Sequence, residues 1–153
     1  MTREFPRAPI LAVSCAVTRG DAVLLVRRGR EPAKGRWGLP GGAVEAGETL
    51  LEAVRREVRE ETGIAIGEPR FLHHHEVIER AGGRVRFHYL IAVHAAEAVG
   101  AAEPAAGDDA DEARFVTAGE QAALDITDGT LRTLRLLRRI ASNAAPSGAV
   151  THP

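Results

Sequence analysis

The sequence is poor in several residue types, and each shortage narrows the kinds of protein that it can encode. Cys15 is the only cysteine among 153 residues, so no disulfide can form within the chain. It lies in an apolar run, which favours a small buried side chain over a nucleophile. A protein without disulfides suits a reducing compartment, and we expect it in the cytoplasm.

Long hydrophobic runs and an excess of one charge are also missing. No stretch approaches the ~20 apolar residues of a membrane-spanning helix, and residues 1–9 do not read as the start of a signal peptide. The formal net charge is −1 and 27% of residues are charged, which gives no general attraction to nucleic acid or membranes. We expect small-molecule partners, with no nucleic acid and no membrane.

The length suits one domain with a sizeable core. We divide the chain into an N-terminal extension (1–9), one domain (10–141) and a polar tail that we expect to be disordered (142–153). Hydrophobic patterning predicts strands at 10–17, 22–28, 69–78, 84–95 and 113–116, a small helix that ends at 124, and longer helices at 50–62 and 131–140. This order indicates an α/β protein with a mixed sheet between helical layers.

The helix predicted at 50–62 has clear boundaries and three distinct sides. Thr49 and Glu52 form a capping-box pattern at its start, and Gly63 supplies a stop. With about 3.6 residues per turn, one side is apolar, and we expect it to dock the helix. Its members are Leu50, Leu51, Val54 and Val58.

Three glutamates, Glu57, Glu60 and Glu61, form another arc beside the apolar side. Glu57 and Glu61 are like charges four residues apart, an arrangement that costs about 0.2–0.5 kcal/mol even when exposed. A solvated surface explains the Glu/Arg pairs elsewhere on this helix, but not this one. A divalent cation does explain it, because Mg²⁺ prefers oxygen ligands. The arc therefore predicts a metal site.

The segment from Gly42 to Ile64 resembles the Nudix box, the signature of hydrolases that cut a diphosphate joined to a nucleoside. The box is a Gly, five residues, a Glu, seven residues, and then Arg-Glu-apolar-x-Glu-Glu-x-Gly-apolar. Every fixed position is matched, by Gly42, Glu48, Arg56, Glu57, Val58, Glu60, Glu61, Gly63 and Ile64. So many matches at fixed spacing are far more specific than a lone glycine-rich motif.

The resemblance covers about residues 10–140 and implies the Nudix fold, an α/β/α sandwich. It implies that Glu57, Glu60 and Glu61 are catalytic and bind Mg²⁺, for which Mn²⁺ can substitute. The carbonyl oxygen of Gly41 is a further metal ligand in the family. Because family members frequently form homodimers, a homodimer is a further expectation.

The remaining box residues have structural roles in the family. Glu48 and Arg56 would pair to brace the loop against the helix. Gly42 and Gly63 would allow the backbone to turn.

Residues outside the box supply further candidates. Asp109 lies in an acidic loop where related enzymes often place a metal-binding or catalytic acid, although a solvated loop explains it equally. Arg27, Arg28 and Arg36 flank the predicted mouth of the site, where a guanidinium fork would match phosphate oxygens. Ordinary strand-end charges are the alternative explanation for these arginines.

Two other features favour structural roles. Trp37 could stack on a base, but beside Leu39 it is expected to pack under the loop. In a strand, His73 and His75 face one way and His74 the other. Three histidine ligands on one ion would therefore be awkward, and we interpret the run as structural.

The strands beyond the box bear on the substrate. Residues 76–80, 86–89 and 106–110 look like a bacterial Nudix subgroup of ADP-ribose pyrophosphatases, although many of these carry a proline where this chain has Glu79 and Arg80. The expected reaction is hydrolysis of ADP-ribose to AMP and ribose 5-phosphate. One alternative is a MutT-like nucleoside triphosphate pyrophosphohydrolase, acting on oxidised guanine nucleotides among others. The other is a non-catalytic Nudix nucleotide sensor, against which the intact box acids argue.

Overall fold

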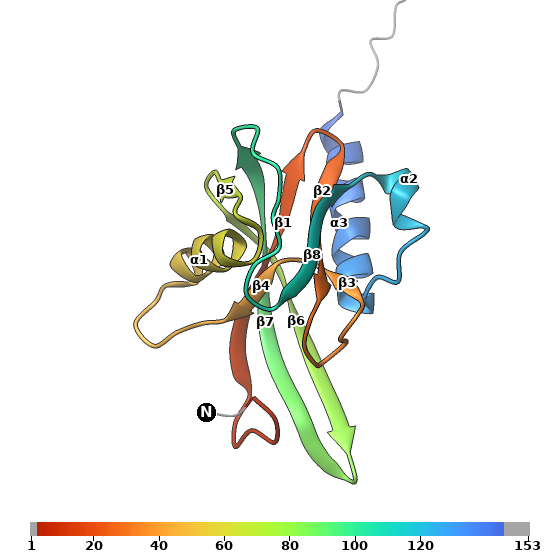
Figure 1. Ribbon diagram of the computed structural model, residues 1–153. Helices are drawn as coiled ribbons and strands as arrows, with labels where there is room; N and C mark the ends of the chain where they lie inside the picture. The colour runs from red at the N-terminus through yellow and green to blue at the C-terminus, as the bar shows by residue number, and fades with distance from the viewer. Residues whose placement is uncertain (1–2, 146–153) are drawn as a thin grey trace, which may run out of the picture.

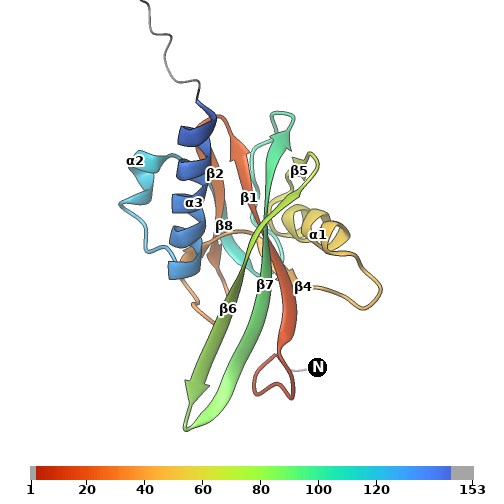
Figure 2. The same ribbon diagram turned by 180° about the vertical axis from the view of Figure 1, so that it is seen from behind.

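The computed structural model describes residues 3–145 of the chain. Its centre is a mixed sheet of eight strands between two helical layers, with α1 (Leu50–Thr62) on one face and α3 (Asp128–Ala144) on the other (Figure 1 and Figure 2). A shorter helix, α2 (Ala118–Gln121), precedes α3. The predicted α/β class and the sandwich architecture are confirmed.

The sheet has β1 at its centre. The strands are β1 (Ile10–Arg19), β2 (Ala22–Arg28), β3 (Trp37–Gly38), β4 (Gly41–Ala43), β5 (Ala65–Ile66), β6 (Arg70–Ala81), β7 (Arg84–Val99) and β8 (Ala110–Val116). Their order is β3-β2-β1-β7-β5, with β4 paired to β1, β6 to β7 and β8 to β2. β1 runs parallel to β7 and antiparallel to β2 and β4. Because β4 and β2 share one edge of β1, the start of the α1 segment lies at the centre of the sheet.

The core alternates along β1 as the period of a strand requires. Val13, Cys15 and Val17 point to the α1 face and pack there with Val54 and Val58. The opposite face holds a second cluster of buried residues, which includes Ala16, Val23, Leu25, Trp37, Leu39, Val93, Val116, Ile126 and Leu134. Cys15 is completely buried, as predicted.

The predicted boundaries of α1 are confirmed. Thr49 caps the helix in a capping box with Glu52, and Gly63 ends it at φ 71°. The prediction that Leu51 helps to dock the helix is wrong, because this residue is 36% exposed. It lies in the first turn, next to the exposed loop 45–47, whereas the buried positions begin at Ala53.

α3 differs from the helix predicted at 131–140, since it begins at Asp128 and continues to Ala144. Its first turn is polar, so the apolar periodicity that predicted the helix does not reach it. The first three residues of the expected tail, 142–144, are helical, and residues 146–153 lie outside the described part of the chain. β8 also begins earlier than the predicted 113, at Ala110.

β6 and β7 form a long hairpin that extends beyond the other strands, and the N-terminal residues lie beside it (Figure 1). Within residues 3–145, no helix is long and apolar enough to cross a membrane.

Candidate active site

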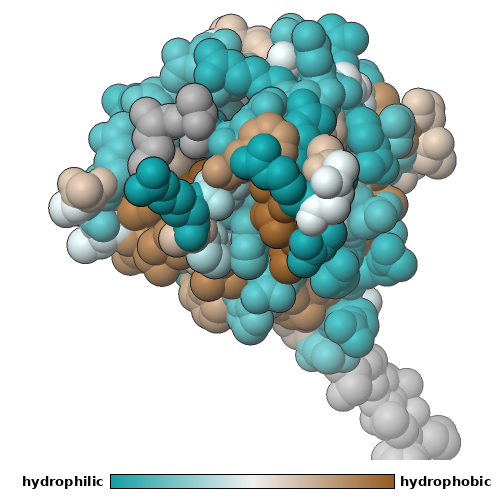
Figure 3. Space-filling model, turned by 90° about the horizontal axis from the view of Figure 1, so that it is seen from below, coloured by the Kyte–Doolittle hydropathy of each residue, from teal (hydrophilic) through white to brown (hydrophobic). Residues whose placement is uncertain are grey.

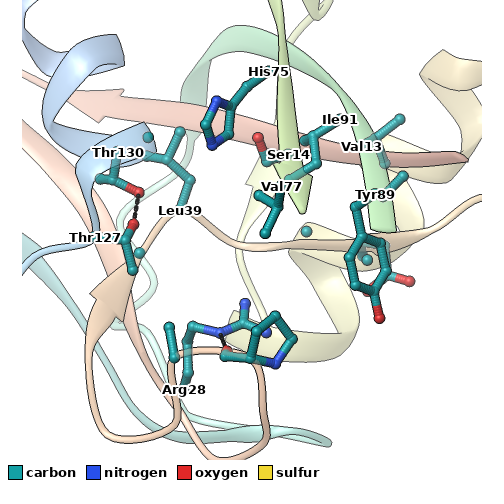
Figure 4. A pocket seen from close by; sticks show the side chains of 18 of the residues that line it. Val13, Ser14, Arg28, Leu39, His75, Val77, Tyr89, Ile91, Thr127 and Thr130 are labelled. Carbon is teal, nitrogen blue, oxygen red and sulfur yellow. Dashed lines mark hydrogen bonds between the residues drawn. The ribbon is translucent and has the colours of Figure 1, made fainter. Parts of the chain in front are cut away.

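A cavity of about 980 Å³ opens between α1, the β6–β7 hairpin and the start of α3. Figure 4 shows His75, Leu39 and Thr130 at one end of it, Tyr89 at the other, and Arg28 across from Val77. Seen from below, this end of the molecule is mostly hydrophilic, with hydrophobic residues visible between the polar ones (Figure 3).

The acidic arc predicted on α1 lines this cavity with Glu57, Glu60 and Glu61. Glu57 and Glu61 are partly buried, whereas the side chain of Glu60 is 44% exposed. The backbone N–H of Gly41 donates to Glu61 Oε2 at 3.1 Å. This bond ties the arc to β4 and therefore to the centre of the sheet.

The glutamates crowd one another electrostatically. Burial raises the pKa of Glu61 to about 7, and the charge of Glu57 adds to this, while the Gly41 N–H opposes it. Burial also raises the pKa of Glu57, against the effect of its hydrogen bond from Arg56. Burial, with the like charge of the neighbouring glutamates added to it, therefore disfavours the ionised form of Glu57 and Glu61.

Arg56 joins the arc to the loop before α1. Its Nε and Nη2 donate to Glu48 at 2.5 and 2.9 Å, and its Nη2 also donates to the Ala43 carbonyl. Its Nη1 lies 2.7 Å from Glu57 and 3.1 Å from Glu60. The hydrogen bond from Arg56 lowers the pKa of Glu48 to about 2. The predicted Glu48–Arg56 pair is thus present, and its arginine also reaches the arc.

Gly42 has a different function from the one predicted. Its φ lies outside the left-handed region, so the backbone there does not need a glycine. A Cβ at Gly42 would instead lie 2.5 Å from the Glu57 carboxylate. Gly63 does have the positive φ that was expected.

The arc has suitable ligands for a divalent metal, although they are not yet in a binding arrangement. Within residues 3–145, no three Asp, Glu, His or Cys side chains converge as a preformed metal site. Arg56 Nη1, which contacts both Glu57 and Glu60, holds part of the arc as a substitute cation. The ligands fit in their chemistry, because several carboxylate oxygens close together suit a hard ion such as Mg²⁺ or Mn²⁺.

Asp109 is brought to the cavity by the loop before β8. Gly107 N–H donates to the Glu61 carbonyl at 3.0 Å, and Asp109 accepts from Gly29 N–H through its own carbonyl at 2.8 Å. Its carboxylate lies 2.8 Å from Arg30 and 4.0 Å from Arg3. The charge of Asp109 also contributes to the raised pKa of Glu61. Asp109 is therefore near the arc, but it pairs with arginines.

Comparison with known proteins agrees with this geometry. The profile of the NUDIX domain matches residues 8–137. This chain belongs to the NUDIX domain family. It is 39% identical over 107 residues to the ADP-ribose pyrophosphatase of Methanocaldococcus jannaschii, a match that covers 70% of this chain and 61% of that protein.

Two other similar proteins have names that do not mention ADP-ribose. The human 8-oxo-dGDP phosphatase NUDT18 is 44% identical over 70 residues, which cover 46% of this chain and 21% of that protein. The crystal structure of the MutT NUDIX hydrolase from Burkholderia pseudomallei has a TM-score of 0.73 at 29% identity and covers 84% of this chain and 98% of its own. The chain thus spans 61% of the length of the Methanocaldococcus jannaschii relative and 21% of the length of the human one.

Of the three arginines predicted to bind substrate, two line the cavity of this Nudix domain. Arg28 donates to the Pro32 carbonyl at 2.7 Å, and Arg36 pairs with Asp125 at 3.1 Å. Arg27 is not among the residues that line the cavity, and it lies 3.8 Å from Glu112. The cause is the alternation along β2, which places Arg27 on the opposite face from Arg28.

Several residues that line the cavity were not predicted from the sequence. Arg30 lies in the bend after β2, where the two-residue period of a strand no longer applies, so its place at the cavity could not be predicted. Arg3 gave no signal, because nothing in the sequence links residues 1–9 to the site. Thr127 and Thr130, whose hydroxyls are 2.9 Å apart, were missed because the polar first turn of α3 lacks apolar periodicity.

Trp37 packs in the core and the histidines alternate along β6 as predicted, but His75 lines the cavity, where only a structural role was expected. His73 Nε2 lies 3.0 Å from Thr133 Oγ1, and His75 lines the cavity on the same side of β6. A Cβ at Gly129 would lie 2.4 Å from His75 Nε2, so the start of α3 packs directly on this ring. Trp37 is buried in the second core cluster, with Arg114 over its ring.

Proposed function

We propose that this Nudix domain is a metal-dependent pyrophosphohydrolase that cleaves the diphosphate of a nucleoside diphosphate derivative. One observation carries the proposal: the arc of Glu57, Glu60 and Glu61, of which Glu57 and Glu61 are partly buried, lines the same cavity as Arg28. Carboxylates that hold a cation, facing a guanidinium, form the charge pattern needed to bind and attack a phosphate group.

We assign the metal to Glu57, Glu60, Glu61 and the Gly41 carbonyl, with Mg²⁺ as the expected ion and Mn²⁺ as a substitute. Bound there, the ion would offset phosphate charge and acidify an attacking water. Arg28 orients the diphosphate through its guanidinium. Asp109, which lies near the arc, is proposed to accept the proton that the attacking water loses.

ADP-ribose, hydrolysed to AMP and ribose 5-phosphate, is our proposed substrate. The name of the Methanocaldococcus jannaschii relative supports it, as that relative is similar to 70% of this chain. The cavity of about 980 Å³ is at the upper end of the usual size for small-ligand sites. A two-ended cavity also suits a substrate with a group on each side of the diphosphate.

A MutT-like nucleoside triphosphate pyrophosphohydrolase is the second candidate, supported by the name of the Burkholderia pseudomallei relative. The name of the human relative supports oxidised guanine nucleotides as a substrate class, although as the diphosphate. A non-catalytic sensor has no such support, because all three box acids are present. The cytoplasmic location and the homodimer stay predictions.

Product analysis with Mg²⁺ or Mn²⁺ tests the proposal. The panel is ADP-ribose, NADH, dinucleoside polyphosphates, sugar nucleotides, normal nucleoside triphosphates and oxidised dGTP. AMP with ribose 5-phosphate supports the first candidate, and pyrophosphate with a nucleoside monophosphate supports the second. Glu60→Gln should lose turnover, whereas Glu103→Gln, in an exposed loop outside the cavity, should not. Binding without turnover of any compound would reject the enzyme in favour of a sensor.

A further inference from the structure

The N-terminal segment is fixed to the β6–β7 hairpin by several contacts. Phe5 N–H donates to the Arg86 carbonyl at 2.8 Å, and Arg86 Nη2 lies 3.1 Å from Glu4. The guanidinium of Arg84 lies over the Phe5 ring, 4.5 Å from its centroid. The segment therefore has a defined path along β7, although it lies outside the sheet.

Phe5 adopts a backbone conformation that a bulky residue rarely takes. Its φ is 52°, in the left-handed region. Such conformations persist only where the surroundings hold them, and they concentrate at functional sites. Here the strained turn directs the residues before Phe5 back toward the cavity.

Arg3, two residues before Phe5, is the residue that this turn places at the cavity. It lines the cavity together with Arg30 and Asp109. Arg3 Nη1 is 4.0 Å from Asp109 Oδ2, and Arg30 Nη2 is 2.8 Å from Asp109 Oδ1. Burial raises the pKa of Tyr89 on another wall of the cavity, and the positive charge of Arg3 opposes this rise. Arg3 therefore places a positive charge at the rim of the cavity, beside Asp109.

We propose that Arg3 and Arg30 form a phosphate clamp at the rim of the cavity, and that Asp109 occupies this clamp until substrate phosphate replaces it. The inference rests on the proposed function, since it assigns residues to the diphosphate of that substrate. It adds a contribution from the N-terminal segment to a site otherwise built from α1, the sheet, the loop before β8 and the start of α3.

The chemistry of the exchange favours phosphate. Carboxylate and phosphate oxygens both match the fork of a guanidinium. The Arg3 and Arg30 side chains are 52% and 67% exposed, so their pairs with Asp109 are weak in water. A diphosphate brings more negative charge and more acceptor oxygens than one carboxylate, so it can displace Asp109.

The test uses ADP binding, measured by calorimetry on the full chain, with Ca²⁺ in place of Mg²⁺ so that binding is read apart from turnover. Arg3→Ala should raise the Kd at least tenfold, as expected for loss of a charge-assisted bond. Arg7→Ala is the matched control: it removes the same charge from the same segment, but at an exposed position outside the cavity. Equal effects of the two changes would show general electrostatics and overturn the clamp.

Asp109→Asn should change the Kd for ADP in the opposite direction from Arg3→Ala. If Asp109 occupies the clamp, its neutral form should bind ADP several-fold more tightly, even if turnover falls. Weaker ADP binding would overturn its role as occupant. Arg3→Lys should fall between wild type and Arg3→Ala, because it keeps the charge and loses the fork.

A third change tests how Arg3 is positioned. Phe5→Ala removes the ring that Arg84 covers and should weaken ADP binding in the same direction as Arg3→Ala, with KM raised and kcat little changed. Unchanged ADP binding in Phe5→Ala would overturn the positioning role of the segment. If Arg3→Ala weakens ADP binding as expected but the wild type hydrolyses nothing, the proposed function fails while the clamp stands. If the wild type hydrolyses its substrate but Arg3→Ala binds ADP as tightly as wild type, the clamp fails while the proposed function stands.

Discussion

Gly42 packs directly on the carboxylate of Glu57, such that a Cβ at Gly42 would lie 2.5 Å from the Glu57 carboxyl carbon. Glu57 cannot easily move aside, because Arg56 Nη1 lies 2.7 Å from its Oε1 and only 12% of its side chain is exposed. The first glycine of the box and the first glutamate of the arc therefore depend on each other through space.

Gly42→Ala should displace the Glu57 carboxylate and lower kcat/KM at least tenfold, since catalytic groups tolerate little misplacement. The fold should persist, because the atom that must move is the end of a side chain. Steady-state kinetics and thermal unfolding measure the two effects. Gly67→Ala is the control, where the nearest atom to a new Cβ is Glu97 O at 3.8 Å. Equal activity in the two variants would contradict the packing argument.

Glu61→Gln should separate metal binding from folding. In chelator the variant should be at least as stable as wild type, because burial already disfavours the charged form of Glu61. Mg²⁺ at about 100 times its Kd should stabilise wild type by about 2.7 kcal/mol and raise its Tm by several degrees. The variant should show little of this rise. An equal Mg²⁺ shift in both proteins would remove Glu61 from the metal site.

Glu48→Gln should show a stability loss that depends on pH. Arg56 lowers the pKa of Glu48 from 4.5 to about 2 in the folded chain, so the carboxylate stabilises the fold above its unfolded pKa. The difference in unfolding free energy between wild type and variant should be steady from pH 7 to about 5. It should shrink as the pH falls from 4.5 toward 2. Urea unfolding at pH 7 and pH 3 measures it, and a difference that grows in acid would contradict the pairing.

Gly129→Ala tests the end of the cavity away from the glutamates. The new methyl would meet His75 Nε2 at 2.4 Å and push the ring into the cavity. KM should rise severalfold with kcat nearly unchanged, because the metal arc is on another wall. Gly119→Ala makes the same change at the second residue of α2, with nothing within 4 Å. A fall in kcat without a rise in KM would contradict this assignment.

Much of the site followed from local sequence. The capping box at Thr49, the stop at Gly63 and the acidic arc all lie within one helix, where 3.6 residues per turn sets their geometry. The face of His73 and His75 followed from the two-residue period of a strand. The wrong predictions concern residues whose burial depends on contacts with other segments of the chain. Leu51 has the periodicity of a docking residue but lies beside an exposed loop.

The sequence by itself determined the family, the helix that carries the glutamates and the pairing of Glu48 with Arg56, because these depend on spacing along a single segment. Only the tertiary structure decided what faces the arc. Arg3, Asp109 and His75 come from segments far apart in the chain, and they share one cavity because of strand pairing and the path of the N-terminal residues. Such proximity depends on the packing of the whole chain, and no local period records it.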